Sequence, residues 1–256
     1  MSGLLQGRRI AITRPRGQAD SLTAMIAGLG GEAIVCPLLE IAPADDPEPL
    51  RLAIARLDSY SLAVFISPNA VAFSLPQILA RRPWPAALRA VAIGQGSVSL
   101  LATYGIENAL VPNERFDSEA VLALPELQRQ NVAGRRAVIF RGNGGRELLA
   151  ETLRERAVEV DCVSCYQRSA PSDVAALQED LRRGELDAVT VSSSEALRNL
   201  LRLLDDAARA HLAQTPVFVL HPRIAELAQQ LGLRNVVLTA PADAGLVAAL
   251  CAHRWR

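Results

Sequence analysis

A chain of 256 residues, half of them hydrophobic, can fill two domain cores, and its 27 basic and 27 acidic residues leave no net charge. Without excess positive charge there is no general attraction to nucleic acid, and none of the apolar runs approaches the ~20 residues of a membrane span. Every basic residue other than histidine is an arginine, which excludes the phosphate loop of NTPases and catalysis through a lysine amine.

Along the chain, short runs of Val, Ile and Ala alternate with stretches of helical spacing. The first strand is predicted near residues 8–13, a helix follows at 19–29, and a second strand lies near 32–36. Further strands are predicted near residues 61–66, 89–93 and 109–111. These runs are apolar on both faces, which is typical of a parallel sheet covered by helices on both sides.

The second half of the chain repeats the first. Gly7–Arg14 is matched by Gly134–Arg141, 127 residues later. Two more blocks recur in the same order at offsets of 125 and 126 residues, which are 63–67 as 188–192 and 90–94 as 216–220. Because chance would not preserve the order of three blocks, the sequence predicts two similar α/β domains, each with a five-stranded parallel sheet flanked by helices.

Proline-containing segments follow the second strand in each copy, at Pro37–Pro49 and at Ser169–Ser172. Such segments are the natural linkers between domains. Because they occupy equivalent positions, two assemblies are open. One is a tandem pair divided near residue 130, and the other is an exchanged pair in which the chain leaves one domain at the first linker and returns at the second.

The cysteine content and the first residues favour a cytoplasmic protein. Four cysteines, Cys36, Cys162, Cys165 and Cys251, are too few for the disulfide framework of a small secreted domain. Residues 1–7 lack the basic start, apolar middle and small-residue cleavage site of a secretory signal. We therefore expect reduced thiols, a cytoplasmic location, and no nucleic-acid or membrane partner.

The turn after each predicted strand carries small, hydrogen-bonding or basic residues. In a parallel sheet, ligands bind beyond the carboxyl ends of the strands, where helix N-termini present unpaired N–H groups. The candidate ligand-binding residues are Arg14, Ser67, Asn69, Gly94, Ser97, Arg141, Gly142, Gly144, Arg146, Ser192, Ser193, Ser194, His221 and Arg223. Such residues also cap helices, but six turns of this kind with several arginines favour a ligand with several negative groups, bound in a cleft between the two domains.

Two motifs resemble ligand-binding patterns but do not fulfil them. The segment 142–147 begins like a dinucleotide-binding fingerprint, but Glu147 stands where the third glycine is needed. Cys162 and Cys165 have the spacing of a metal-binding pair, but residues three apart in a strand point to opposite faces. No metal site is therefore expected.

Eight segments with these residues stand in a defined order: Ile12–Pro15, Ile66–Val71, Ala92–Gly94, Asp117–Ala120, Arg141–Leu148, Cys165–Arg168, Ser192–Glu195 and His221–Ala225. In order and spacing they resemble the uroporphyrinogen-III synthase family over nearly the whole chain. The resemblance implies two flavodoxin-like domains joined by a two-stranded linker. Residues 1–36 with 168–256 would form one domain, and 37–167 the other.

The resemblance also implies a function. Members of the family close the linear tetrapyrrole hydroxymethylbilane, a polycarboxylate, into a ring, with loss of water and inversion of the last pyrrole. This implies a monomeric lyase of tetrapyrrole and heme biosynthesis that acts on a small molecule without metal or other cofactor. Tyr166, which the residues alone leave open as an edge aromatic or a ligand-facing acid, matches the family's tyrosine and would be catalytic. The turn His221-Pro222-Arg223-Ile224 departs from the more usual Gly-Pro-Thr-Thr and lacks its hydroxyls.

Two other classes of protein remain open on the sequence. A non-catalytic two-lobed binding protein or sensor for a small polyanion also closes over its ligand, but it usually carries an export signal or a DNA-binding domain. A flavin or nicotinamide oxidoreductase can be built on a similar sheet. Such an enzyme would be yellow or would gain thermal stability when a nucleotide binds.

Overall fold

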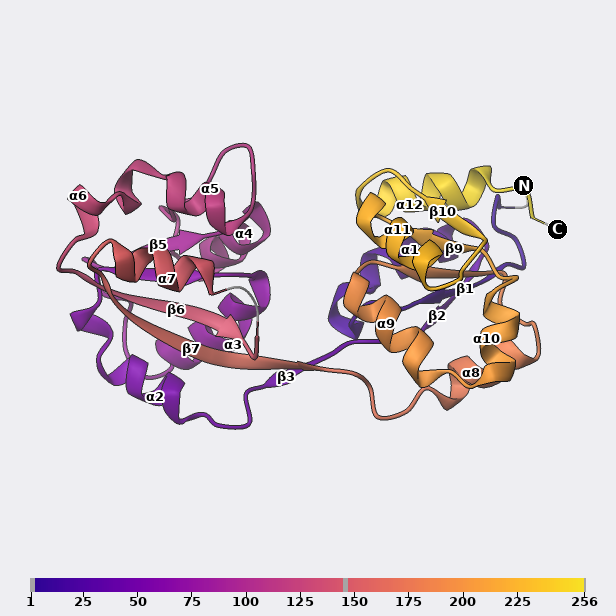
Figure 1. Cartoon of the computed structure of the whole chain (residues 1–256), viewed down its shortest axis with the longest axis horizontal. Helices are drawn as coiled ribbons and strands as arrows, with labels where there is room; N and C mark the ends of the chain where they lie inside the picture. The colour runs from indigo at the N-terminus through magenta and orange to yellow at the C-terminus, as the bar shows by residue number, and fades with distance from the viewer. Residues whose placement is uncertain (1–2, 145–146, 256) are drawn as a thin grey trace. The chain divides into compact units, whose positions relative to one another are not determined.

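The computed structural model of the protein describes residues 3–144 and 147–255. The chain divides into two compact units, each with its own sheet and helices (Figure 1). Unit 1 comprises Met1–Glu40 with Ser169–Arg256, and unit 2 comprises Ile41–Arg168. None of the described helices has the length and apolar character of a transmembrane segment.

The sheet of unit 1 takes strands from both ends of the chain. Its order is β10-β9-β8-β1-β2, and each neighbouring pair runs parallel. The strands are β1 (Arg9–Ile12), β2 (Glu32–Val35), β8 (Ala188–Val191), β9 (Val217–Val219) and β10 (Val236–Leu238). The first strand of the chain therefore pairs directly with a strand from its last third.

Helices cover both faces of this sheet because the strand residues are apolar on both sides. Ile10 and Ile12 contribute to a core with α1 and α12, whereas Ala11, between them, contributes to a core with the other helices. The helices are α1 (Asp20–Gly28), α8 (Ala175–Arg182), α9 (Ser194–Leu203), α10 (Asp206–Leu212), α11 (Pro222–Gln230) and α12 (Ala242–Ala252), with a short 3-10 turn at Arg16–Gln18. Burial on both faces is the arrangement expected of parallel strands.

The sheet of unit 2 has the order β3-β7-β6-β4-β5, and the four strands from β7 to β5 run parallel. The strands are β3 (Glu40–Pro43), β4 (Leu62–Phe65), β5 (Arg89–Ala92), β6 (Arg136–Gly142) and β7 (Glu159–Ser169). The chain passes between the units near the start of β3 and near the end of β7, which lie side by side. These two strands therefore form the connection.

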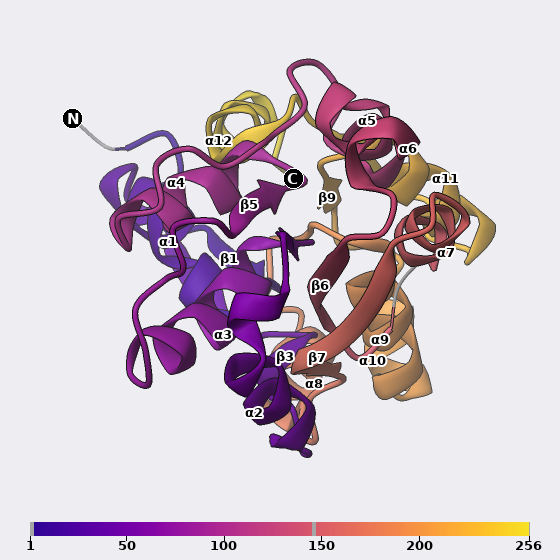
Figure 2. The ribbon, with the colours of Figure 1, turned by 90° about the vertical axis from the view of Figure 1, so that its left-hand side faces the viewer.

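Two helical layers also enclose the sheet of unit 2, and Figure 2 shows α2 and α3 on one side of β6 and β7 and α7 on the other. Ala63 and Phe65 of β4 pack toward α2, α3 and α4. Leu62 and Val64, which alternate with them along the strand, pack toward α5, α6 and α7. The helices are α2 (Glu48–Ala55), α3 (Pro68–Leu79), α4 (Gln95–Thr103), α5 (Ser118–Ala123), α6 (Arg129–Val132) and α7 (Leu148–Glu155), with 3-10 turns at Leu57–Ser59 and Pro125–Leu127.

One predicted strand is a single bridge instead. The sequence predicts a strand near residues 109–111, but only Leu110 pairs there, with Val91. Pro112 follows two residues later and has no N–H with which to extend a ladder. The prediction of a strand at this position is wrong, and β3 supplies the fifth strand of the sheet.

The sequence repeat is visible as a repeated ion pair. Arg9 at the start of β1 pairs with Glu32 at the start of β2, and Arg136 at the start of β6 pairs with Glu159 at the start of β7. The distances are 3.3 and 2.9 Å, and in both sheets the two residues are register partners. The two copies of the sequence thus build the same strand pair in different sheets.

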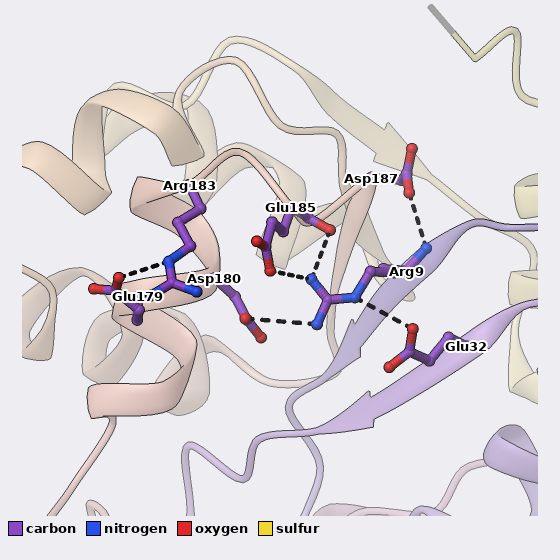
Figure 3. Close-up of polar contacts among 7 residues, drawn as sticks. All are labelled: Arg9, Glu32, Glu179, Asp180, Arg183, Glu185 and Asp187. Carbon is purple, nitrogen blue, oxygen red and sulfur yellow. Dashed lines mark hydrogen bonds and ion pairs between the residues drawn. The ribbon is translucent and has the colours of Figure 1, made fainter.

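In unit 1 this arginine is the centre of a larger cluster (Figure 3). The guanidinium of Arg9 also lies 2.7 Å from Glu185 and 3.6 Å from Asp180, and its backbone N–H donates to Asp187. Burial alone would lower the pKa of Arg9, but the surrounding carboxylates together raise it above its ordinary value. The cluster ties the amino end of β1 to α8 and to the turn before β8.

Candidate functional site

Within each unit, the predicted turns lie at the carboxyl ends of neighbouring parallel strands. In unit 2, Ser67 follows β4, Gly94 follows β5, and Arg141 is the last residue but one of β6. In unit 1, Arg14 follows β1 and Ser192 follows β8, while His221 follows β9. Each unit therefore presents one edge that is rich in hydrogen-bond donors.

Tyr166 is the centre of a hydrogen-bonded group in unit 2. Its side chain is only 1% exposed and stacks on Phe73, with ring centroids 5.9 Å apart. The guanidinium of Arg168 donates to its hydroxyl at 3.1 Å, and the hydroxyl lies 3.0 Å from Oγ of Ser67. Because Arg168 has no acceptor, the tyrosine proton is free to be donated to Ser67.

A glycine makes room for this tyrosine. A Cβ atom on Gly142 would lie 2.8 Å from the ring of Tyr166, closer than side chains can approach. Gly142 is paired with Tyr166 in the register of β6 and β7, where the strands carry an irregularity. The structure thus gives Gly142 a packing role, since the absence of a side chain leaves space for the ring of Tyr166.

Ser67 links the buried tyrosine to the surface. Its Oγ accepts the backbone N–H of Ala70 at 3.2 Å and so caps α3, and the side chain is half-buried. When Oγ also accepts the proton of Tyr166, both of its lone pairs are used and its own O–H remains available to a ligand. Helix capping and ligand binding are alternatives on the sequence, but Ser67 can do both.

Arg141 is a nearly buried cation at the end of β6. Its side chain is 10% exposed and pairs with Glu147 at 2.7 Å. It lines a cavity of about 110 Å³ whose other walls are Ile66, Ile93, Ser118, Ile139, Gly144, Leu149 and Ala150. Gly144, at φ 135°, adopts a conformation that favours glycine. Arg146 lies outside the described residues.

The other candidates of unit 2 differ in exposure. Ser97 is buried in the first turn of α4, whereas Asn69 is half-buried at the start of α3. Gly94 begins α4 in extended conformation and packs against Phe116, whose ring is 51% exposed. An exposed aromatic ring beside a helix N-terminus is a feature that sequence reasoning missed.

In unit 1, two of the predicted side chains are helix caps. Oγ of Ser193 accepts the N–H of Ala196 at 3.0 Å, and Nδ1 of His221 accepts the N–H of Arg223 at 3.2 Å. A groove of about 590 Å³ runs between the starts of α9 and α11, lined by Ser193, Ser194, Glu195, Arg198, Arg223, Glu226, Leu227 and Gln230. It brings predicted residues of two turns together.

Sequence reasoning also missed Arg198 in this groove. It lies one turn after Ser194 in α9, on the same helix face, so the i to i+4 spacing was the available signal. Arg14, by contrast, was predicted but is held in an ion pair with Asp243 of α12, and the two side chains are 14% and 22% exposed. It is less accessible than Arg198 and Arg223, which are exposed.

The fold and these edges define a class: a protein of two α/β units whose parallel strands end in turns rich in N–H groups, hydroxyls and arginines. Residues 20–248 match the family model described as uroporphyrinogen-III synthase HemD. The uroporphyrinogen-III synthases of Escherichia coli and Salmonella typhimurium are 37% and 38% identical to the chain, each over 91% of it and 96% of the relative. The chain therefore belongs to the uroporphyrinogen-III synthase family.

Solved structures agree with this in fold. Uroporphyrinogen III synthase from Thermus thermophilus, as a mutant, superposes with a TM-score of 0.62 at 17% identity, covering 95% of this chain and 97% of that one. The enzyme from Helicobacter pylori gives a TM-score of 0.61 at 16% identity, with 96% and 100% covered. The shared fold is thus retained at low sequence identity.

Proposed function

We propose that this protein is a lyase that converts linear hydroxymethylbilane to uroporphyrinogen III, with loss of water and inversion of ring D, in tetrapyrrole and heme biosynthesis. The observation that carries the proposal is the 37% identity to the Escherichia coli enzyme over 91% of the chain. The donor-rich strand ends support it, because a substrate with many carboxylates needs many N–H groups and arginines.

The proposed reaction begins with departure of the terminal hydroxyl as water. The hydroxyl gains a proton as the carbon–oxygen bond breaks, which leaves an electrophilic methylene group. The substituted carbon of ring D attacks this methylene group and forms a spiro intermediate. That intermediate fragments and recloses at the other carbon, and loss of a proton completes the inverted ring. Atoms balance with water as the only product besides the ring.

We assign the proton delivery to the group around Tyr166. The burial of Tyr166 and its contact with Ser67 support a route in which Ser67 gives its proton to the departing hydroxyl and recovers one from the tyrosine. Arg168, which donates to the tyrosine oxygen, stabilises the negative charge that develops there. In this proposal Ser67 touches the substrate, and Tyr166 acts through it.

Most of the rate enhancement is expected from holding the substrate in a curled shape. The free bilane closes to the uninverted isomer without help, so the protein must favour attack at the more hindered carbon. We propose that turns of both units bind carboxylates of one substrate molecule. In unit 1 these are the turns at Ser192–Ser194 and at His221, where Arg223 takes the place of the family's hydroxyl residue.

Supplying the purified protein with hydroxymethylbilane tests the proposal. After oxidation, chromatography separates the type I and type III porphyrins, and a reaction without protein gives the spontaneous background. Type III is the expected product, formed faster than the background. Type I alone would refute the assignment and would leave a non-catalytic polyanion-binding protein as the better interpretation.

We propose further that the protein acts as a monomer in the cytoplasm. The low number of cysteines and the proposed biosynthetic role support this. Sedimentation velocity at the working concentration is expected to give a single species near the chain mass of 27.5 kDa. A species of twice that mass would contradict it.

A further inference from the structure

The ion pair of Arg141 and Glu147 is unequal in burial. The arginine side chain is 10% exposed, whereas the glutamate side chain is 52% exposed. A buried guanidinium requires a negative partner because its desolvation is costly, but a half-exposed carboxylate is easily returned to water. Arg141 therefore keeps its position, and Glu147 is the partner that can leave.

The cavity beside Arg141 has the character of a small binding pocket. Ile66, Ile93, Ile139 and Leu149 form apolar walls, and Ser118 and Arg141 are the polar groups. Its volume of about 110 Å³ suits a chain of two or three carbons rather than a pyrrole ring. An aliphatic arm that ends in a carboxylate matches both the walls and the cation.

We infer that this cavity takes one carboxylate-bearing side arm of the substrate, and that Glu147 occupies Arg141 until the arm displaces it. The inference rests on the proposed function, since it names a subsite for the proposed substrate. Glu147 is thus an internal competitor: it keeps the arginine paired in the empty protein and weakens substrate binding by the free energy of its own contact.

The equivalent arginine in the other repeat, Arg14, has a different kind of partner. Asp243, the partner of Arg14, is 22% exposed and lies in the first turn of α12, where the helix N-terminus stabilises its charge. A carboxylate held in this way does not exchange readily with a ligand. Of these two pairs, the Arg14–Asp243 pair is therefore a fixed contact, and the Arg141–Glu147 pair is exchangeable.

Replacing Glu147 with glutamine is the direct test. Glu147→Gln removes the competing charge and is expected to lower KM about three- to fivefold with kcat unchanged, the range of a partly exposed ion pair. Glu151→Gln is the matched control, because Glu151 is an exposed residue of the first turn of α7. It removes the same charge nearby and is expected to change KM less than twofold. A higher KM in Glu147→Gln, or equal effects of the two variants, would overturn the inference.

A second variant tests the cavity. Ser118→Leu narrows the cavity from the α5 side and is expected to raise KM. In the double variant with Glu147→Gln, the decrease in KM caused by Glu147→Gln is expected to disappear. Retention of that decrease in the double variant would show that the arm binds elsewhere. Thermal unfolding of each variant verifies that it is folded.

A non-reacting probe separates this inference from the proposed function. Propane-1,2,3-tricarboxylate, whose carboxylates stand on short aliphatic arms, is titrated by calorimetry and is expected to bind Glu147→Gln about three- to fivefold more tightly than the unmodified protein. If the unmodified protein forms no type III product but the variant gains affinity for the probe, the proposed function fails and the exchangeable pair stands. If the type III product forms but Glu147→Gln changes neither the probe affinity nor KM, the proposed function stands and the exchangeable pair is refuted.

Discussion

Among the candidate site residues, Tyr166 is contacted on several sides: a serine and an arginine lie at its oxygen, a phenylalanine stacks on its ring, and a glycine leaves space beside the ring. A side chain with so little exposure cannot contact substrate widely. Its hydroxyl is nevertheless one hydrogen bond away from a half-buried serine at the start of a helix. The position favours a role in proton supply over a role in binding.

Replacing Tyr166 with phenylalanine tests this role. The variant keeps the ring and its stacking but cannot supply a proton, so kcat is expected to fall about 10- to 100-fold with KM within about twofold. Loss of the two hydrogen bonds of the hydroxyl, with Ser67 and Arg168, costs about 2 kcal/mol of stability. Steady-state kinetics, product isomer analysis and urea unfolding measure the three quantities.

Tyr104→Phe is the control for that substitution, because Tyr104 is exposed at the end of α4. It is expected to match the unmodified protein in rate and stability. Full rate together with full type III selectivity in Tyr166→Phe would remove the tyrosine from the mechanism. A change in KM alone would make it a binding residue.

The cysteines give a prediction about pH. Burial raises the pKa of Cys165 to about 12 and that of Cys36 to about 11, whereas Cys162 is exposed. At pH 9, iodoacetamide is expected to label Cys162 well before Cys165, as read by peptide mass spectrometry. Equal labelling rates would contradict the burial, and the urea-unfolded protein, which should label at all four cysteines, is the control.

The same shifts have a consequence for stability. The raised pKa values mean that the folded protein retains thiol protons that the unfolded chain loses near the ordinary pKa of 9.0. Their contribution to stability is therefore complete below about pH 9 and is lost as the pH rises toward 11 and 12. The free energy of unfolding should decline over that window.

Much of the site at the residue scale could be predicted, but not its internal contacts. The turns after the strands could be located because parallel strands end at one edge. The pairing of Arg14 with Asp243, or the burial of Ser97, depends on helices that are distant in sequence. No local pattern encodes such contacts, so predicted ligand groups can prove to be occupied or inaccessible.

At the scale of elements, an ion pair joins the amino ends of the repeated strand pair in both units. In unit 1, Arg9 contacts three carboxylates, from β2, α8 and the turn before β8. Partly exposed ion pairs are weak singly, but these share one cation whose side chain is 29% exposed. They hold together elements that come from the two ends of the chain.

We expect Arg9→Ala to lower the free energy of unfolding by about 1–2 kcal/mol, the combined effect of three partly exposed pairs. Arg89→Ala is a matched control, since Arg89 also begins a strand but is exposed. Urea unfolding at low salt and at 1 M salt provides the measurement. Because salt screens such pairs, the difference between the two variants should shrink at high salt. A difference that does not depend on salt would indicate lost packing instead.

The elements themselves were predictable to different degrees. Strands β1, β4 and β6 are buried on both faces, and their apolar runs allow them to be predicted from the sequence. The strand β3 is short and half exposed, so nothing in Glu40–Pro43 distinguishes it from a linker. Residues 109–111 carry the apolar run of a strand but form only one bridge. Edge strands depend on their neighbours more than on their own sequence.

At the scale of the whole molecule, the units do not coincide with the sequence repeats. Unit 2 is one continuous segment, Ile41–Arg168, with cores on both faces of its sheet. A sequence repeat such as 1–128 would instead contain β1 and β2 without β8, and β4 and β5 without β6. The local pattern could not reveal this, because the two linkers occupy equivalent places in the two copies.

Expression of fragments tests this organisation. The fragment 41–168 is expected to unfold in one cooperative transition, since its sheet and both of its cores are complete. The fragment 1–128 is expected to lack such a transition, although it has the same number of residues and a full copy of the repeat. Thermal unfolding followed by circular dichroism distinguishes them, and cooperative unfolding of 1–128 alone would contradict the division.

The discontinuous unit has a consequence for the order of events at the ribosome. Strands β1 and β2 are synthesised first, yet β8, the second partner of β1, follows β2 by about 150 residues. At ordinary rates of translation this is a delay of roughly 10 to 30 seconds, during which the continuous unit can fold completely. The nascent chain must keep two apolar strands from pairing with other molecules throughout that interval, so slow translation or a shortage of chaperones should affect the N-terminal segment first.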